Sequence, residues 1–308
     1  QRGTWISTKV SDSIELSRID PATKAKVLLE ALPYVQKFRD SLFVVKYGGS
    51  FLDENNLEMQ RRVAMDIVFL ASVGIRVALV HGGGKAITRA LSSNGIQTRF
   101  VNGLRYTDET SIQTVEQTLN GEVNDQICKT IEEAGGVPAP TPGQRVFSCQ
   151  KLEIDPAGNP LDLGFVGSIT GVSPFEVKAP LSERRIPVIS CIAADDEGHP
   201  FNTNADMAAA HLASSLGARR LVYLCDVPGL LHDPRNPSSL ISTLPLGDVD
   251  GLKASGVIAS GMLPKVDGAS HAIREGVRRV HFVDATQPHS LLLEIFTHTG
   301  IGTEIVLD

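Results

Sequence analysis

The sequence lacks long apolar runs and clusters of basic residues. No stretch of its 308 residues approaches the ~20 consecutive apolar residues that span a bilayer, and Gln1–Lys9 has no apolar segment like that of a signal peptide. The net charge of −6 comes without any Lys/Arg-rich run. We therefore expect neither a membrane nor a nucleic acid as partner.

Cysteine is also scarce. The four cysteines are far apart, with no C-x-x-C pair: Cys128, Cys149, Cys191 and Cys225. This spacing favours buried thiols in a reducing compartment over a disulfide framework or a zinc site. We predict a cytoplasmic protein with no metal site built from its own side chains.

The two commonest phosphate-binding motifs are missing. Gly84-Lys85 is followed by Ala86 rather than Ser or Thr, and no glycine stands five residues before Gly84, so there is no Walker A loop. There is no Rossmann G-x-G-x-x-G either. A protein that handles phosphate would have to use another loop.

Two glycine clusters are the most informative feature that is present. Val44-Val45-Lys46-Tyr47-Gly48-Gly49-Ser50 and Val80-His81-Gly82-Gly83-Gly84 each follow a short β-prone run. A glycine turn that opens into a helix leaves backbone N–H groups free for an anion. Taken alone, each cluster would be interpreted as a tight turn, which is the usual structure of Gly-Gly after a strand. The pair, with Lys46 at a strand end, predicts a cradle for phosphate or carboxylate.

The chain alternates between strand-like and helix-like segments. This alternation predicts an α/β fold, a three-layer sandwich with a largely parallel central sheet. The expected strands are 42–46, 76–80, 186–193, 220–224, 279–283 and 303–306, and the expected helices are 57–71, 85–94, 108–134, 205–216, 263–275 and 290–297. Ligands of such sheets bind at the carboxyl ends of the strands, where both glycine clusters fall.

The two ends of this pattern and its middle need separate treatment. Residues 1–24 are expected to be flexible. A helix is expected within Pro21–Phe38, covering most of residues 25–40, with a kink or break at Pro33. Prolines 138, 140 and 142 should interrupt the chain before two hairpin strands at 146–154 and 164–169.

Further segments carry polar side chains at expected turns and helix starts. Asn102-Gly103-Leu104-Arg105 presents an arginine, which suits a carboxylate but could also be a solvated side chain. Asn202-Thr203-Asn204-Ala205-Asp206 could bind a ligand or simply cap a helix. Asp226-Val227-Pro228-Gly229-Leu230-Leu231 follows a strand, and Lys265 lies in the first turns of a helix, where a lone lysine is usually solvated.

In this order and spacing, these segments resemble the N-acetyl-L-glutamate kinases of the amino acid kinase family. The segments are Lys46–Gly49, His81–Gly84, Asn102–Arg105, Asn202–Asp206, Asp226–Gly229 and Gly261–Val266. Each segment is weak alone, but together they are specific, and the resemblance covers roughly residues 25 to 306. It implies ATP-dependent phosphorylation of the side-chain carboxylate of N-acetyl-L-glutamate in arginine biosynthesis, with ATP and Mg²⁺ as cofactors.

The resemblance also implies roles for individual residues. Lys46 and Lys265 would stabilise the transferred phosphoryl group, and Asp206 would orient both lysines. The substrate would be held by Gly49, Gly83, Gly84, Arg105, Asn202 and Asn204. The nucleotide would be held by Asp226, Val227, Pro228, Gly229, Leu230, Leu231, Val257, Ile258 and Ala259. Residues 41–215 would form an N-terminal substrate lobe, and residues 216–308 a C-terminal nucleotide lobe.

Regulation is implied as well. The N-terminal helix with Tyr34 resembles the extension of arginine-inhibited, hexameric family members, and His281, Glu294 and Gly300 match positions of their arginine site. A homo-oligomer, either a dimer or a hexamer, and inhibition by L-arginine follow as hypotheses. One stretch departs from the family pattern: Pro140–Val146 stands where members commonly carry Gly-Leu-Ser-Gly-Lys-Asp-Gly.

Three other functions stay open at this point. The chain could be a related kinase that acts on another acylated amino acid or carboxylate. It could be a non-catalytic, arginine-sensing module like the kinase-like domain of N-acetylglutamate synthases, although the presence of both lysines argues against this. It could also be a kinase relative that has lost its activity through the changed 137–146 stretch, since a fold can outlive its chemistry.

Overall fold

The central sheet has eight strands in the order β12-β14-β13-β11-β1-β2-β8-β5. The computed structural model describes residues 20–48, 51–52, 56–155, 158–258 and 260–308. The strands are β1 Leu42–Tyr47, β2 Arg76–His81, β5 Pro138–Thr141, β8 Ile186–Ser190, β11 Arg220–Cys225, β12 Thr243–Pro245, β13 Arg279–Asp284 and β14 Thr303–Val306. Neighbouring strands are parallel except for β13 and β14. The predicted largely parallel α/β sheet is therefore confirmed.

The strands at the centre of the sheet are continuous apolar runs. Every residue of β1 and of β11 is buried, as expected for parallel strands that are covered on both faces. β1 pairs with β2 on one side and with β11 on the other, so Lys46 lies between Val80 and Tyr223. The carboxyl ends of these three strands meet at one edge of the sheet.

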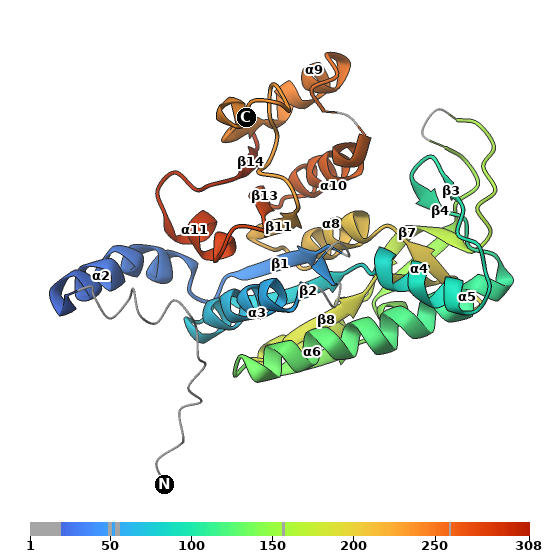
Figure 1. Cartoon of the computed structure of the whole chain (residues 1–308), viewed down its shortest axis with the longest axis horizontal. Coiled ribbons are helices and arrows are strands. Elements are labelled where there is room, and N and C mark those ends of the chain that lie inside the picture. Colours follow the sequence, from blue (N-terminus) through green and yellow to red (C-terminus); the bar gives the residue numbers. More distant parts are fainter. Residues whose placement is uncertain (1–19, 49–50, 53–55, 156–157, 259) are drawn as a thin grey trace, which may run out of the picture.

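Helices cover both faces of the sheet (Figure 1). The helices of the chain are α2 Pro21–Phe38, α3 Leu57–Ser72, α4 Gly84–Ser93, α5 Glu109–Gln117, α6 Asn124–Glu133, α7 Phe175–Ser182, α8 Ala205–Ser215, α9 Val249–Ala254, α10 Leu263–Arg274 and α11 Ser290–Phe296. α3 packs against α6 and α11, while α8 packs against α10 and against β1, β2 and β11. This arrangement gives the three layers that the sequence predicts.

The α8–α10 contact is close because small residues form it. Ala208, Ala209 and Ala210 of α8 are fully buried. A Cβ atom on Gly268 of α10 would come within 2.7 Å of the Tyr223 hydroxyl and 3.5 Å of the Ala210 Cβ. Glycine and alanine therefore let the two helices approach each other and the sheet, which brings the start of α8 close to the end of β1.

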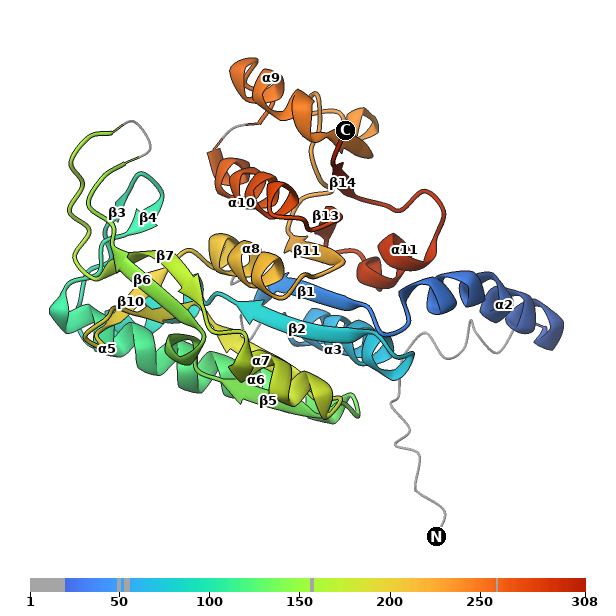
Figure 2. The same cartoon turned by 180° about the vertical axis from the view of Figure 1, so that it is seen from behind.

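A second, smaller sheet lies beside the first. β6 Phe147–Lys151, β7 Val166–Val172, β9 Ile192–Ala194 and β10 Pro200–Thr203 close into a four-stranded barrel, seen from behind in Figure 2. The expected strand 186–193 is in fact divided at Cys191, where the chain leaves the large sheet after β8 and enters the barrel as β9. The expected hairpin strands at 146–154 and 164–169 correspond to β6 and β7.

The structure differs from the sequence-based expectations at several prolines and in two helices. Helix α2 continues past Pro33, so the chain is not broken there. The prolines at 138 and 140 do not interrupt the sheet but lie in β5, an edge strand, where the missing N–H of proline is tolerated. Helix α7, which contains Pro180, and the short α9 were not predicted at all. The predicted flexibility of residues 1–24 falls almost entirely outside the described part of the chain.

The expected helix over 108–134 is present with one irregularity. α5 and α6 are joined by a π-helical segment at Thr118–Val123. π-helical turns are rare and occur mostly as single turns at functional sites. Here the wider turn lies against the second glycine cluster, because a Cβ on Gly83 would come within 2.6 Å of the Leu119 side chain.

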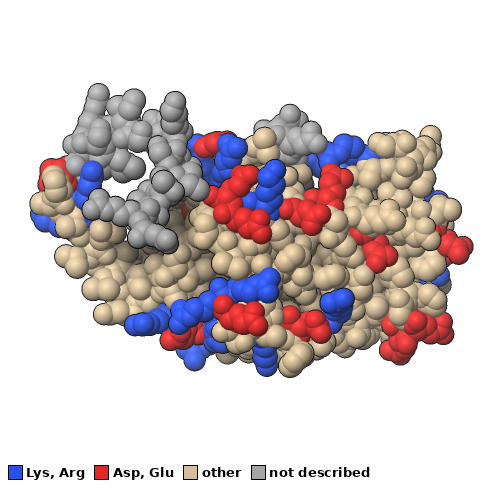
Figure 3. Space-filling model, turned by 90° about the horizontal axis from the view of Figure 1, so that it is seen from below, with Lys and Arg blue, Asp and Glu red and all other residues tan. Residues whose placement is uncertain are grey.

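The distribution of charge on the surface and the apolar character of the helices can be described from the structure. On the face seen from below, acidic and basic side chains are interspersed (Figure 3). Of the helices in the described ranges, none combines the length and apolar character that a membrane crossing requires.

Candidate active site

One carboxylate joins two lysines at the carboxyl edge of the sheet. Asp206 Oδ1 lies 2.8 Å from Lys46 Nζ, and its Oδ2 lies 3.0 Å from Lys265 Nζ. The three side chains come from β1, the first turn of α8 and the start of α10. Residues that lie 160 and 59 positions apart in the sequence therefore meet, which is the arrangement that the resemblance implies.

Local sequence explains how Asp206 is placed. The Asn204 side chain caps α8 by accepting hydrogen bonds from the N–H groups of Asp206 (2.8 Å) and Met207 (3.1 Å). The Tyr223 hydroxyl donates to the Asp206 backbone carbonyl at 3.0 Å. The reading of this segment as a helix cap is confirmed.

The opposite charges in the cluster stabilise one another, as the pKa shifts of Lys46 and Asp206 show. Burial alone would lower the pKa of the Lys46 ammonium, but the adjacent Asp206 carboxylate outweighs it and raises that pKa. Burial would likewise raise the pKa of Asp206, and the two lysines hold it below its ordinary value. Lys46 is therefore an ammonium and Asp206 a carboxylate near neutral pH. With two lysines against one carboxylate, the cluster suits an anion.

Two buried thiols, for which the sequence indicated no function, lie near the lysine cluster. Cys191 and Cys225 are close enough to Lys46 to interact with its charge, and burial raises the pKa of each thiol to about 12. They are protonated near neutral pH and form a weakly polar wall. In such surroundings the attraction between Lys46 and Asp206 is stronger than it would be in water.

The glycine turns flank the lysine cluster. Gly48 is described, and a Cβ there would lie 3.6 Å from Lys46 Nζ. Gly83 and Gly84 begin α4, and their turn follows β2, which is adjacent to β1. Gly49 lies outside the described residues. The two predicted turns therefore follow neighbouring strand ends.

Arg105 is buried rather than solvated, with 6% of its surface exposed. Its guanidinium donates to the Gly84 carbonyl (2.8 Å), the Thr88 hydroxyl (2.9 Å) and the Thr98 hydroxyl (3.1 Å). Asn102 and Gly103 both have positive φ, as the tight turn between β3 Phe100–Val101 and β4 Leu104–Arg105 requires. Because its partners are neutral acceptors, the buried cation can still take an anionic ligand.

The remaining predicted substrate residue, Asn202, lies in β10. Its amide donates to the Thr107 hydroxyl at 3.3 Å, and Thr107 lies two residues beyond Arg105. Asn202 and Arg105 are thus linked through one buried threonine. Thr107 was missed from the sequence, where a single threonine after a turn gives no signal.

The predicted nucleotide residues follow β11 and precede α10. Asp226, Val227 and Pro228 are exposed, whereas Gly229 and Leu230 are buried. The Leu230 N–H donates to the Thr303 hydroxyl at 2.8 Å, and a Cβ on Gly229 would come within 2.5 Å of that hydroxyl. Leu231 and Val257 are half-buried and Ile258 is buried. Ala259 lies outside the described residues.

The four predicted regulatory residues line one cavity of about 110 Å³. His281 Nδ1 lies 2.7 Å from Glu294 Oε1, and Glu294 Oε2 accepts from the N–H groups of Ile301 (2.7 Å) and Gly302 (2.9 Å). A Cβ on Gly300 would come within 2.6 Å of the same carboxylate, and Gly300 has positive φ. Tyr34 of α2 closes the cavity from the other side.

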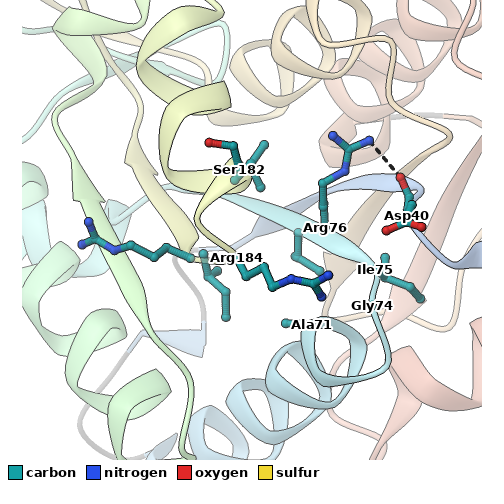
Figure 4. Close-up of a pocket in the computed structure, with 11 residues that line it drawn as sticks. Asp40, Ala71, Gly74, Ile75, Arg76, Ser182 and Arg184 are labelled. Carbon is teal, nitrogen blue, oxygen red and sulfur yellow. Dashed lines mark hydrogen bonds between the residues drawn. The ribbon is translucent and has the colours of Figure 1, made fainter.

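Two larger cavities lie at the opposite, amino edge of the sheet and do not include the lysines. They have volumes of about 340 and 470 Å³ and share Asp40 and Arg76. Arg76 donates to the Asp40 carbonyl at 2.8 Å, and Arg184 lies near it (Figure 4). The ends of helices α3 and α7 line the first cavity. Arginines there offset the partial negative charge of helix C-termini, so size alone does not indicate a ligand site.

Comparison with known proteins agrees with this geometry. The amino acid kinase family profile matches residues 41–284. The acetylglutamate kinase of Akkermansia muciniphila is 42% identical over 285 residues, which cover 92% of this chain and 95% of that one. The acetylglutamate kinase of Nostoc sp. is 42% identical over 299 residues, covering 96% and 97%.

Solved structures share the fold. N-acetylglutamate synthase from Neisseria gonorrhoeae, complexed with coenzyme A and N-acetyl-glutamate, is 27% identical with a TM-score of 0.79, over 91% of this chain and 63% of that one. The same synthase is also known complexed with L-arginine, with a TM-score of 0.75. Carbamate kinase from Giardia lamblia, bound to AMP-PNP, has a TM-score of 0.60 at 15% identity and shares the fold alone. The chain belongs to the amino acid kinase family and, within it, to the acetylglutamate kinases.

Proposed function

We propose that the protein transfers the γ-phosphoryl group of ATP to the side-chain carboxylate of N-acetyl-L-glutamate, a step of arginine biosynthesis. The observation that carries this proposal is the Lys46–Asp206–Lys265 cluster, with distances of 2.8 and 3.0 Å. It offers two ammonium groups, held apart by one carboxylate, at the strand ends where ligands of parallel sheets bind. The curated relatives at 42% identity are named for this reaction.

The reaction needs no general base. A carboxylate is already ionised at neutral pH, so one of its oxygens attacks the γ-phosphorus directly while the bond from that phosphorus to the β,γ-bridging oxygen breaks. An acyl phosphate and ADP are formed, and no proton is transferred. Catalysis then consists of positioning two anions and stabilising the charge of the transferred group. Lys46 and Lys265 supply that stabilisation, and Asp206 fixes the spacing between them.

Arg105, the glycine turns and the two asparagines support an acylated amino acid as the acceptor. Arg105 suits the α-carboxylate, because it is buried and contacts only neutral acceptors among the described residues. The N–H groups of the turn at Gly83 and Gly84, where α4 begins, suit the reacting carboxylate. Gly49, which lies outside the described residues, is assigned to the same role from the resemblance alone. Asn202 and Asn204 suit the acetamide and the remaining polar groups.

ATP would be held by the segment after β11 and by residues 257–259. Gly229 and Leu230 pack against Thr303, and this contact anchors the segment after β11 to β14. Among the described residues, no three His, Cys, Asp or Glu side chains are grouped as metal ligands, and Asp206 is engaged by two lysines. Mg²⁺ would therefore be held chiefly by the ATP phosphates, where it offsets their charge. In this division of labour, residues 41–215 form the substrate lobe and residues 216–308 the nucleotide lobe.

We also propose inhibition by L-arginine at the cavity around Glu294. The buried Glu294 carboxylate suits a guanidinium or ammonium, while Lys37 and Arg220, which line the same cavity, suit a carboxylate. Arg279 and Glu304, also in the lining, are paired with each other. Helix α2 contributes Tyr34 to this cavity. It leaves Leu28, Leu29 and Leu32 exposed on one side, at the i, i+3 and i+4 spacing of a helix face. An apolar helix face of this kind supports assembly into a homo-oligomer. Four buried thiols without a disulfide support a cytoplasmic location.

The test is ATP-dependent formation of an acyl phosphate, trapped as a hydroxamate. N-acetylglutamate, glutamate, aspartate and N-acetyl-aminoadipate are compared as acceptors, with and without arginine. We expect strong turnover with N-acetylglutamate alone and suppression by arginine. Turnover with a different acylated amino acid would identify a related kinase. A folded chain that binds arginine without turning over any acceptor would favour a sensing module, which the likeness to the synthase makes the second candidate.

A further inference from the structure

A closed ring of polar contacts surrounds the short 3₁₀ turn Gly143–Arg145. Gln144 Nε2 donates to Glu116 Oε1 at 2.8 Å, and Gln144 Oε1 accepts from Asn120 Nδ2 at 3.0 Å. Asn120 Oδ1 accepts from the Ser190 hydroxyl at 2.6 Å, and Ser190 Oγ accepts from the Gly143 N–H at 2.9 Å. Gln144 is thus held at both ends of its amide, which fixes its orientation.

Two unusual backbone features make this ring possible. Asn120 lies in the π-helical segment Thr118–Val123 between α5 and α6. Gly143 sits directly on the chain between β8 and β9, since a Cβ there would come within 2.2 Å of the Ser190 carbonyl and 2.3 Å of the Ile192 carbonyl. Both the wide helical turn and the glycine are needed to bring these elements together.

The ring adjoins the predicted acceptor site on two sides. Ser190 is the β-sheet partner of His81, which begins the glycine cluster, and Ile192 is the partner of Asn202. On the other side, Leu119 of the same π-helical segment is the contact that only a glycine at position 83 permits. Residues 190–192 therefore connect the Gly83–Gly84 turn with Asn202. Gly143 packs directly against their backbone.

We propose that Gln144 is a positioning residue for the acyl amino acid: through Asn120 and Ser190 it sets the spacing between the Gly83–Gly84 turn and Asn202. This inference rests on the proposed function, because it assigns the acceptor to those groups. The ion pairs of Lys46 and Lys265 with Asp206 involve none of the ring residues. Gln144 therefore governs acceptor binding, and phosphoryl transfer depends on the lysines.

The sharpest test exchanges the donor and the acceptor of the hydrogen bond between Gln144 and Glu116. Gln144→Glu places a carboxylate against the Glu116 carboxylate and removes the donor between them. We expect the KM for N-acetylglutamate to rise about tenfold, as the loss of one partly buried hydrogen bond implies, while kcat and the KM for ATP change less than twofold. The double variant Glu116→Gln with Gln144→Glu restores a donor at 116 and an acceptor at 144, and we expect it to recover most of the lost affinity.

Gln150→Glu is the matched control, since Gln150 is exposed on β6, six residues from Gln144. It makes the same change of charge without touching the ring, and we expect wild-type constants. Melting temperatures of all variants show whether a change in KM is only a loss of stability.

Three results would overturn the proposal. The first is an unchanged KM for N-acetylglutamate in Gln144→Glu. The second is a double variant whose KM for N-acetylglutamate is no lower than that of the single variant. The third is a Gln144→Glu variant whose kcat, KM for ATP and melting temperature are impaired as much as its KM for N-acetylglutamate. Equilibrium binding of N-acetylglutamate is measured alongside. A wild-type chain that binds this acceptor without phosphorylating it contradicts the proposed function but still tests Gln144, whereas a wild-type chain that does neither overturns both.

Discussion

Two buried carboxylates, Asp206 and Glu294, are similarly enclosed but differently surrounded. Asp206 is 6% exposed and Glu294 8%. Asp206 contacts two ammonium groups, whereas Glu294 contacts one histidine nitrogen and two backbone N–H groups. The Asp206 cluster holds two lysines against one carboxylate, whereas no lysine or arginine is among the direct contacts of the Glu294 carboxylate within the described residues.

This contrast separates a site for anions from a site that can take a cation. The excess ammonium at Asp206 suits a transferred phosphoryl group. The Glu294 carboxylate, at the wall of a cavity of about 110 Å³, suits the positive groups of arginine. The same residue type thus has different surroundings in the two places, lysines at Asp206 and a histidine with backbone N–H groups at Glu294. Each of the following experiments tests one side of this comparison.

The largest effect is expected at Lys46. Lys46→Met leaves Asp206 paired with Lys265 alone and removes the excess charge. We expect kcat to fall about 10²–10³-fold, as for the loss of one preorganised donor to a transition state, with little change in either KM. Steady-state kinetics of the hydroxamate assay measures this. Lys129→Met, at an exposed position on α6, is the control, and a loss in kcat below tenfold at Lys46 would contradict the role.

A smaller effect is expected at Arg105. Arg105→Lys keeps the charge but cannot reproduce the contacts of the planar guanidinium to Gly84, Thr88 and Thr98. We expect the KM for N-acetylglutamate to rise about 10–100-fold, the range for hydrogen bonds to charged groups, while the KM for ATP stays unchanged. Arg99→Lys, at an exposed arginine six residues away, should have no effect. Equal changes in both KM values would argue against contact with the acceptor.

At Glu294 we expect a change in regulation rather than in turnover. Glu294→Gln removes the negative charge but preserves the size of the side chain. Half-inhibition should require about tenfold more arginine, as for one weakened charged hydrogen bond, and kcat without arginine should stay near the wild-type value. Glu133→Gln, at an exposed position, serves as control. A variant inhibited like the wild type would place the effector elsewhere.

The smallest expected effect is in acid stability. Burial would raise the pKa of Glu294, but the bond to His281 and the N–H groups of Ile301 and Gly302 lower it overall. A lowered native pKa stabilises the fold above the unfolded pKa of Glu, and that stability is lost as the pH falls through the native value. Denaturant unfolding between about pH 5 and pH 3 should therefore show a shallower loss for Glu294→Gln than for the wild type. Identical slopes would show that the carboxylate is not stabilised by folding.

Most of the fold could be predicted because its elements depend on local patterns. The apolar runs at β1 and β11 and the alanines of α8 are visible in the sequence and are buried as expected. β5 was missed because its prolines exclude a central strand but not an edge strand. A kink or break was expected in α2 at Pro33, and the helix continues through this residue without a break.

The candidate site also has features that could be predicted from the sequence and features that could not. The sequence by itself determined which residue types were available: lysines at a strand end and a helix start, glycines after strands, and an arginine after an Asn-Gly turn. Resemblance to a family supplied their roles. Neither could show that Arg105 is buried, that Tyr223 supports Asp206, or that Cys191 and Cys225 surround Lys46, because burial depends on which strands become neighbours.

Only the tertiary structure decided the contacts between distant segments. Lys46 and Lys265 meet at Asp206 because β1, α8 and α10 pack together through small residues. Gln144 meets Asn120 of the π-helical segment and Glu116 at the end of α5, which lie more than twenty residues away in the sequence. A local pattern sets the conformation of each segment. The distance between two side chains that are far apart in the sequence is set by how densely those segments pack.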